Sequence, residues 1–211
     1  MQQKEDAVIQ VKDLYKIYRM GEEKVYALNG VSFEIHRGEF CAITGPSGSG
    51  KSTLLNMLAG IERPSGGEVY IGKYRIDNLS EADLAKFRQK FTGFIFQSYN
   101  LMPTMTALEN VALPLMFKGV GKEEREAKAM EMLKLVGIDN RYMHKPKEMS
   151  GGQQQRVGIA RAFVTDPSVV FADEPTGNLD SKTTIEVMDL IKQLVYTKKQ
   201  TLVMVTHDAN V

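Results

Sequence analysis

The sequence lacks a second cysteine, a long apolar run and any large excess of one charge, and each absence excludes a class of protein. Cys41 is the one cysteine among 211 residues, so no disulfide can form within the chain, as is typical of a reducing cytoplasm. Lysine and arginine total 27 and aspartate and glutamate total 26, which gives a formal net charge of +1. So balanced a chain has no overall attraction to nucleic acid or anionic lipid, and any charged ligand must be held by a local site.

No stretch of the sequence approaches the ~18 consecutive apolar residues of a transmembrane helix. The nearest candidate, residues 111–117, is short and contains Pro114. Residues 1–12 are mixed and charged, with no apolar segment of the length found in signal peptides. If the protein works at a membrane, we expect a separate subunit to span it.

Short strands and helices alternate at both ends of the chain and predict an α/β fold with a parallel sheet. Strands are predicted at residues 8–14, 30–35, 40–44, 68–71, 94–96, 168–172 and 201–206, and helices at 51–59, 122–136, 153–165 and 181–196. Ala127, Met130 and Leu133 are predicted to share one face of a helix. We therefore expect a single domain over residues 1–211, with a core at about 1–96 and 154–211 and a largely helical insertion at about 98–153.

A glycine-rich loop between a predicted strand and a predicted helix is the strongest chemical signal. Residues 45–52 match the P-loop pattern, in which glycines let successive backbone N–H groups point at phosphate oxygens. The following helix adds the positive end of its dipole. Lys51 supplies a full positive charge to the β and γ phosphates, and the hydroxyl of Ser52 can ligate Mg²⁺. The residues predicted to hold the nucleotide here are Gly45, Pro46, Ser47, Gly48, Ser49, Gly50, Lys51, Ser52 and Thr53. A chance glycine- and serine-rich surface turn is the alternative.

The predicted strand at residues 168–172 is followed by two carboxylates, Asp173 and Glu174. In a P-loop protein an acid at such a place meets the metal ion, so Asp173 is predicted to orient Mg²⁺, directly or through water. Glu174 is predicted to polarise the water that attacks the γ-phosphate. Pro175 is expected to keep Glu174 out of the helical region, so that the chain stays extended and then turns. Two solvated acids at a strand end are the alternative.

Residues 149–153 place a serine, two glycines and a glutamine at the start of a predicted helix. They resemble the LSGGQ signature of ABC ATPases, with Met149 in place of the usual leucine, which exchanges one apolar residue for another. Ser150 and Gln153 also have the spacing of a capping box. Both interpretations can hold, because a capped helix start with two glycines is a good phosphate receptor.

Other residues occur in the order that this family uses. Gln97 follows a predicted strand and matches the Q-loop, residues 178–180 match the D-loop, and His207 matches the switch histidine. Tyr18 lies where the family places an aromatic ring that stacks on adenine. A lone residue of these types is usually structural, so the resemblance depends on their joint order around the P-loop and the signature.

The resemblance covers essentially the whole chain and implies a RecA-like P-loop NTPase core with an N-terminal antiparallel β part and a helical signature subdomain. It implies ATP and Mg²⁺ as cofactors and a homodimer that forms head to tail when ATP binds. Each ATP then lies between one P-loop and the signature of the other copy. The residues implied on the signature side are Ser150, Gly151, Gly152, Gln153 and Asp180. Glu174 is then the general base, His207 holds the γ-phosphate and water, and Gln97 contacts Mg²⁺ and the water.

Within the family, residues 45–56, 151–156 and 172–180 are similar to the branch that serves lipoprotein release, macrolide export and antimicrobial-peptide export. This resemblance implies an ATPase subunit that energises a separate integral-membrane permease, binds no nucleic acid, and is cytoplasmic and peripheral on the inner face of the cell membrane. Met102, Met105 and Met116 are predicted to line a groove for a short cytoplasmic helix of that permease. Ordinary packing of the helical insertion is the alternative.

Two other functions remain open on the sequence. One is an ATPase that regulates a cell-envelope hydrolase through a membrane partner, because its ATPase would look the same. The other is a soluble ABC ATPase that acts on ribosomes or DNA, although such proteins usually carry two domains of this kind or a long coiled-coil insertion. Members of the family usually continue past the switch histidine, whereas this sequence stops at Val211. We therefore expect the strand before His207 to lack cover.

Overall fold

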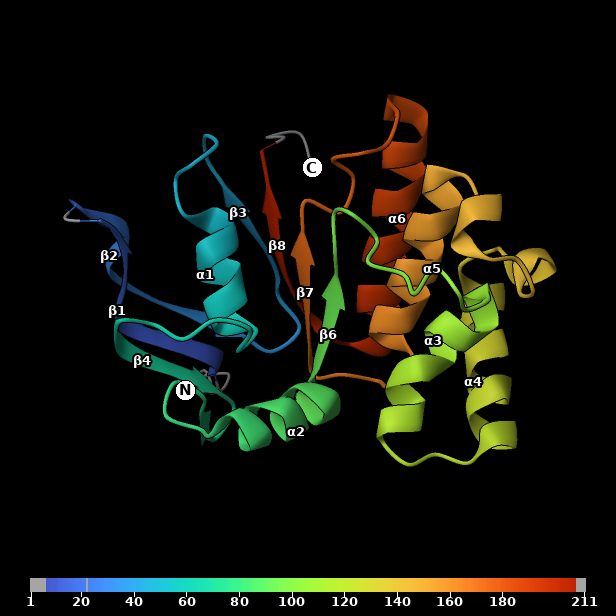
Figure 1. The fold of residues 1–211 in the computed structure, drawn as a ribbon, viewed down its shortest axis with the longest axis horizontal. Helices are drawn as coiled ribbons and strands as arrows, with labels where there is room; N and C mark the ends of the chain where they lie inside the picture. The colour runs from blue at the N-terminus through green and yellow to red at the C-terminus, as the bar shows by residue number, and fades with distance from the viewer. Residues whose placement is uncertain (1–6, 22, 208–211) are drawn as a thin grey trace, which may run out of the picture.

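The computed structural model describes residues 7–21 and 23–207 and contains two β-sheets with helices packed around them (Figure 1). The first sheet is antiparallel, in the order β2-β1-β4-β5, and consists of β1 (Ala7–Met20), β2 (Glu23–His36), β4 (Gly66–Ile71) and β5 (Tyr74–Arg75). The second is parallel, in the order β3-β8-β7-β6, and consists of β3 (Phe40–Thr44), β6 (Thr92–Ile95), β7 (Val169–Asp173) and β8 (Thr201–Thr206). The predicted parallel core and N-terminal antiparallel part are both confirmed.

Six α-helices lie within the described residues: α1 (Lys51–Leu58), α2 (Glu81–Phe91), α3 (Ala107–Phe117), α4 (Lys122–Leu135), α5 (Gly151–Phe163) and α6 (Ser181–Lys198). Two short 3₁₀ turns, η1 (Asp139–Arg141) and η2 (Pro146–Glu148), lie between α4 and α5. The sequence patterns do not predict α2, which buries only Leu84 and Phe87 and so shows little apolar periodicity. No helix in the described ranges is long and apolar enough to cross a membrane.

The parallel sheet separates two apolar clusters, so its central strands are buried on both faces. Along β7, Val169 and Phe171 belong to the cluster that contains α1 and the antiparallel sheet, whereas Val170 and Ala172 belong to the cluster that contains α5 and α6. All six residues of β8 are buried. The expectation that this strand lacks cover is therefore wrong, because it lies between β3 and β7 with apolar clusters on both faces. The end of the chain, residues 208–211, lies outside the described part.

The buried face of α4 differs from the predicted one. Ala127 is exposed and Met130 is half-buried, whereas Ala129, Met132 and Leu133 are buried. The buried positions are spaced i, i+3 and i+4, which matches a helix of 3.6 residues per turn better than a repeat of three. This face contacts α3 and α5, so the three helices form one layer beside the sheet (Figure 1).

The carboxyl ends of the parallel strands lie at one edge of the sheet, at the top of Figure 1. The predicted P-loop follows β3, Gln97 comes shortly after β6, Glu174 directly after β7, and His207 directly after β8. Ligands of open α/β sheets bind at this edge, and the fold therefore brings the predicted residues of the core to one place.

Candidate nucleotide-binding site

The loop between β3 and α1 has a backbone that only glycine can adopt at a key position. Gly48 and Gly50 have φ angles of 78° and 86°, in the left-handed region. A Cβ atom on Gly50 would lie 2.3 Å from the carbonyl oxygen of Ala27 in β2. Both the backbone angle and the lack of space exclude a side chain there, so the glycine spacing of the loop is a requirement of the fold.

Lys51 places a positive charge inside this loop. Its side chain is buried, and Nζ donates to the carbonyl oxygens of Gly45 (2.9 Å) and Pro46 (2.8 Å). Phosphate oxygens form stronger charge-assisted hydrogen bonds than neutral carbonyl groups do. A phosphate that enters the loop can therefore replace these two acceptors.

Ser52 and Asp173 bring a hydroxyl and a carboxylate together, with Ser52 Oγ donating to Asp173 Oδ1 at 2.9 Å. Burial raises the pKa of Asp173, and the neighbouring charge of Glu174 raises it further, whereas the Ser52 hydrogen bond and the charge of Lys51 lower it. Hydroxyl and carboxylate oxygens are the hard ligands that Mg²⁺ prefers, and a bound cation would favour the ionised carboxylate. The donor set therefore fits Mg²⁺.

Glu174 adopts a left-handed backbone, with φ 43°, so the expectation that it stays extended is wrong. Its N–H donates to the carbonyl oxygen of Val205 in β8 (2.9 Å), and its own carbonyl oxygen accepts from the N–H of Gly177 (3.0 Å). Pro175 disfavours the right-handed helical region, and these two hydrogen bonds hold the left-handed one. Left-handed backbones in residues other than glycine cluster at functional sites, and Glu174 lines the pocket that the P-loop also lines.

His207 reaches Glu174 across the ends of β8 and β7, with Nδ1 3.2 Å from Oε2. When this pair is hydrogen-bonded, the proton is on Nδ1 and the Nε2 atom remains available for another group. The structure thus places a carboxylate and an imidazole together beside the P-loop.

Gln97 and residues 177–178 contact each other near the same turn. The carbonyl oxygen of Gln97 accepts from Asn178 Nδ2 at 3.0 Å. The side chain of Gln97 packs against Gly177, where an added Cβ atom would lie 2.6 Å from Nε2. The predicted Q-loop and D-loop are therefore joined within one chain, and Gly177 provides the space for this contact.

Tyr18 lies in a pocket of about 380 Å³ that the P-loop and Glu174 also line. Its hydroxyl donates to Glu62 Oε1 (2.8 Å), and Lys16 Nζ lies 2.8 Å from the same oxygen. Burial raises the pKa of Tyr18, with a further contribution from Glu62. The remaining lining residues are Val25, Tyr26, Ala27, Ser47, Gly48, Gly50, Lys51, Ser52 and Thr53. The sequence patterns do not identify the three residues from β2, which the structure brings here by pairing Val25 with Tyr18.

The predicted signature residues line a second pocket, of about 440 Å³. Ser150 Oγ accepts from the N–H of Gln153 and Gln153 Oε1 accepts from the N–H of Ser150, which confirms the capping box at the start of α5. Asp180 caps α6 by accepting from the N–H of Thr183 at 3.0 Å. The full lining is Ser150, Gly151, Gly152, Gln153, Arg156, Asn178, Leu179, Asp180, Thr183 and Glu186. Thr183 and Glu186 lie outside the quoted motifs and are found only from the structure, whereas Arg156 ends the stretch 151–156, which the sequence analysis gives no site role.

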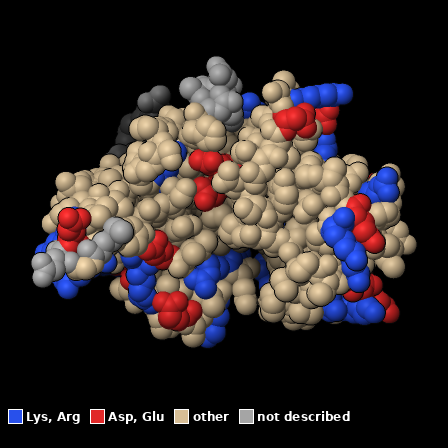
Figure 2. Space-filling view, turned by 45° about the horizontal axis from the view of Figure 1, so that its top comes forward, with Lys and Arg blue, Asp and Glu red and all other residues tan. Residues whose placement is uncertain are grey.

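No lining residue is shared between the P-loop pocket and the signature pocket, among the residues that the structure describes. The predicted site residues therefore form two separate groups on one chain. The face that comes forward in Figure 2 carries its lysine and arginine side chains mostly at the margins, with an acidic group near the middle.

The glycine loop between strand and helix, with an acid that meets its serine, defines a P-loop NTPase. Residues 28–177 match the family described as ABC transporter. The chain belongs to this family, as an ATP-binding subunit of an ABC transporter, and is an ATPase.

Curated relatives and solved structures agree with this assignment. An ABC transporter ATP-binding protein of Thermotoga maritima is 51% identical over 95% of this chain and 86% of its own length. The lipoprotein-releasing system ATP-binding protein LolD of Acinetobacter baylyi is 44% identical, over 95% of this chain and 89% of its own. The ATP-binding cassette MJ0796 of Methanocaldococcus jannaschii is 50% identical over 97% of this chain and 88% of its own length. A dimeric structure of MJ0796 in a post-hydrolysis state with ADP and Pi has a TM-score of 0.89, covering 96% of this chain and 89% of that one. The resemblance inferred from the motifs is confirmed.

Proposed function

We propose that two copies of this chain bind two ATP molecules head to tail with Mg²⁺, and that hydrolysis drives a separate integral-membrane permease. The observation that carries the proposal is the division of the site residues into two pockets. The P-loop pocket contains the positive charge of Lys51 and the candidate base Glu174. The signature pocket instead contains the capped start of α5. Neither pocket alone surrounds a triphosphate, and a second copy supplies the missing half.

In the first half-site, Lys51 and the N–H groups of residues 45 and 47–53 bind the phosphates, and Tyr18 stacks on the adenine. Ser52 and Asp173 would hold the magnesium ion, with Gln97 as a third contact. Bound Mg²⁺ would offset the negative charge that develops on the phosphate oxygens. Tyr18 is partly exposed, its hydroxyl is fixed by Glu62, and Lys16 Nζ lies over one face of its ring, 5.1 Å from the centroid, so the adenine would stack on the opposite face.

Hydrolysis begins when Glu174 accepts a proton from the attacking water. The water oxygen bonds to the γ-phosphorus, the bond to the bridging oxygen breaks, and ADP leaves with the electron pair. Nδ1 of His207 lies 3.2 Å from Oε2 of Glu174, and Nε2 is left to face the γ-phosphate. With a proton on both ring nitrogens, the imidazolium donates to Glu174 through Nδ1 and to a γ-phosphate oxygen through Nε2. Gln97 positions the water from the Q-loop side.

In the second half-site, Ser150, Gly151, Gly152 and Gln153 of the other copy contact the γ-phosphate at the start of α5. Asp180 is at the edge of the same pocket. The dimeric structures of MJ0796, one of them with ADP and Pi, support this arrangement. Binding of ATP closes the dimer and hydrolysis reopens it, so each ATPase cycle moves the two copies relative to each other.

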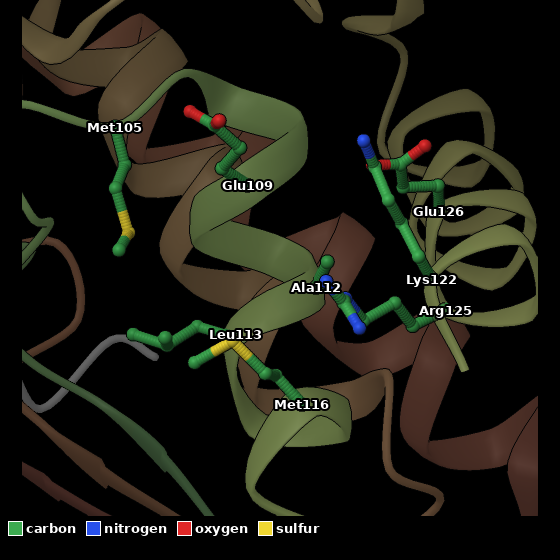
Figure 3. Close-up of a pocket in the computed structure, with 8 residues that line it drawn as sticks. All are labelled: Met105, Glu109, Ala112, Leu113, Met116, Lys122, Arg125 and Glu126. Carbon is green, nitrogen blue, oxygen red and sulfur yellow. The ribbon is translucent and has the colours of Figure 1, made fainter. Parts of the chain in front are cut away.

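A groove of about 310 Å³ between α3 and α4 is the proposed docking site for the permease (Figure 3). Met105, Leu113 and Met116 supply apolar side chains on one side of the groove, and Lys122 and Arg125 supply charged ones from α4. A short amphipathic helix has both kinds of surface, and flexible methionines adapt to it. The groove and the signature both belong to the proposed helical insertion at about residues 98–153. A movement of the signature is therefore transmitted to the groove, and a movement of the groove to the signature. On this basis the chain is peripheral on the inner face of the membrane.

The permease is tested by capture from detergent-solubilised membranes with the Glu174→Gln protein held closed by ATP. A multi-span membrane protein is expected in the captured complex, whereas a bitopic protein with a wall hydrolase, or ribosomes and DNA-bound proteins, would contradict the proposal. Met105→Glu should abolish capture and leave basal hydrolysis nearly intact. The matched control is Met143→Glu, because Met143 is exposed and does not line the groove.

A further inference from the structure

Gln155 in α5 is fully buried, and its amide bonds to a different element of the fold. Its Nε2 donates to the carbonyl oxygen of Pro175 at 2.5 Å. Because a carbonyl oxygen only accepts, the nitrogen end of the amide is the end that faces Pro175. Pro175 directly follows Glu174, so this hydrogen bond connects the signature helix with the turn that carries the proposed base.

The same helix also holds the chain after Gln97. Arg161 donates through Nη1 to the carbonyl oxygen of Asn100 (2.6 Å) and through Nη2 to that of Tyr99 (2.8 Å). Tyr99 and Asn100 both have left-handed backbones, with φ 60° and 48°. This unusual segment is therefore fixed to α5 through a guanidinium group.

Gln155 lies beside this second attachment. A Cβ atom on Gly158 would be 3.8 Å from Gln155 Oε1 and 3.7 Å from the carbonyl oxygen of Tyr99. The loop after Gln97, the amide of Gln155 and the turn after Glu174 thus neighbour one another along the inner face of α5. A small shift of α5 would displace both the loop after Gln97 and the turn after Glu174, since packed elements transmit strain.

The hydrogen bonding of Gln155 is incomplete. Its Oε1 atom has no hydrogen-bond partner within the described part of the chain. A buried polar atom without a partner lowers stability, so packing alone would favour an apolar side chain of similar size, but that side chain would leave the carbonyl oxygen of the buried Pro175 without this donor. The value of a glutamine at this position therefore lies in its hydrogen bond to the turn beside Glu174.

We propose that Gln155 is a positioning residue for Glu174, through which the signature helix controls the base of its own subunit. This inference rests on the proposed head-to-tail site. There, the start of α5 contacts the ATP held by the other copy's P-loop, while Gln155 acts on the P-loop site of its own copy. Binding at one site is thereby linked to hydrolysis at the other.

The test compares Gln155→Leu with Gln200→Leu in steady-state ATP hydrolysis and thermal unfolding. Gln200 is a matched control because it is also buried, its Oε1 also lacks a partner among the described residues, and its Nε2 also donates to oxygen, on Asp166. It precedes β8, at the edge of the sheet opposite to His207. For Gln155→Leu we expect kcat to fall at least about tenfold, KM to stay within about twofold, and the unfolding temperature to change little, because loss of the unpaired Oε1 offsets loss of the donor to the Pro175 carbonyl oxygen. For Gln200→Leu, kcat stays within about twofold of wild type.

Three results would overturn the inference: equal kcat values for the two leucine variants, a KM effect without a kcat effect, or a lowered unfolding temperature of Gln155→Leu that accounts for its lost activity. The last would identify an ordinary structural residue. Wild type and Glu174→Gln are measured beside them. If Glu174→Gln is inactive while Gln155→Leu equals wild type, the positioning role fails and the proposed function stands. If Glu174→Gln hydrolyses ATP like wild type, the proposed function itself fails.

Discussion

The hydroxyl oxygen of Ser52 lies 2.9 Å from Oδ1 of Asp173, although 121 positions separate the two residues in the chain. Ser52 is in the first turn of α1, and Asp173 is the last residue of β7. Parallel strands and the helix that follows β3 bring these two ends together, and two motifs recognised separately become one site.

Asp173→Asn should weaken the binding of the Mg²⁺ ion that supports ATP hydrolysis. Asparagine has nearly the same size and can still accept the Ser52 hydrogen bond, so the fold is kept while the negative charge is lost. We expect the Mg²⁺ concentration for half-maximal hydrolysis to rise by about 10–100-fold. The measurement is the ATPase rate against Mg²⁺ concentration, with Asp189→Asn, an exposed acid of α6, as the control. An unchanged magnesium requirement would remove Asp173 from the metal site.

Gly93→Ala should destabilise the protein, although Gly93 is in no motif. A Cβ atom there would lie 2.2 Å from the carbonyl oxygen of Ala162 in α5, so β6 and α5 would have to separate. Overpacking of this kind costs about 1–3 kcal/mol, or more where the backbone itself must move. The free energy of unfolding in urea measures it. The control is Gly121→Ala, at the start of α4, because an added Cβ atom there meets nothing within 4 Å.

The capping box at the start of α3 should make stability depend on pH. The backbone hydrogen bond from Thr106 lowers the pKa of Glu109, and the Thr106 hydroxyl lowers it further. A carboxyl group whose pKa is lower in the folded chain stabilises the fold above its unfolded pKa, and this stabilisation is lost as pH falls through the folded value. Glu109→Gln should therefore lower the unfolding temperature at pH 7, and the difference from wild type should vanish in acid. A constant difference at all pH values would contradict this account.

Periodicity and turn residues are sufficient to predict the parallel sheet, the P-loop and the start of α5. The predicted bounds of β3 and β8 agree with the observed ones, because short apolar runs between glycines or polar residues leave few alternatives. The face of α4 was not predictable in the same way. Ala127 and Ala129 are equally apolar, and only packing against α3 and α5 decides which of them is buried.

Motifs identify the residues predicted to contact ligands. They do not identify the residues that hold those side chains in place. Gln97, Asp173, Glu174 and His207 all occupy the predicted edge of the sheet. The left-handed backbone of Glu174 depends on Val205 and Gly177, contacts that Pro175 alone does not reveal. Gln155 and Arg161 likewise act through carbonyl groups of distant residues, and a backbone acceptor leaves no mark on the sequence.

The most direct test of the central claim is the size of the Glu174→Gln protein with and without ATP. Removal of the base should slow hydrolysis by about 10²–10⁴-fold and so preserve the closed dimer. We pair it with Glu174→Gln/Gly151→Asp, which adds a negative charge at the signature. A Cβ atom at Gly151 would lie 2.8 Å from the Tyr99 hydroxyl and 3.7 Å from Leu179 Cδ2, so the tip of the Tyr99 side chain must move aside, and an acid in the first turn suits the helix. On a sizing column, the single variant should elute as a dimer with ATP and a monomer without it, and the double variant as a monomer in both. A monomeric single variant in saturating ATP, or an ATP-dependent dimer of the double variant, would contradict the head-to-tail site.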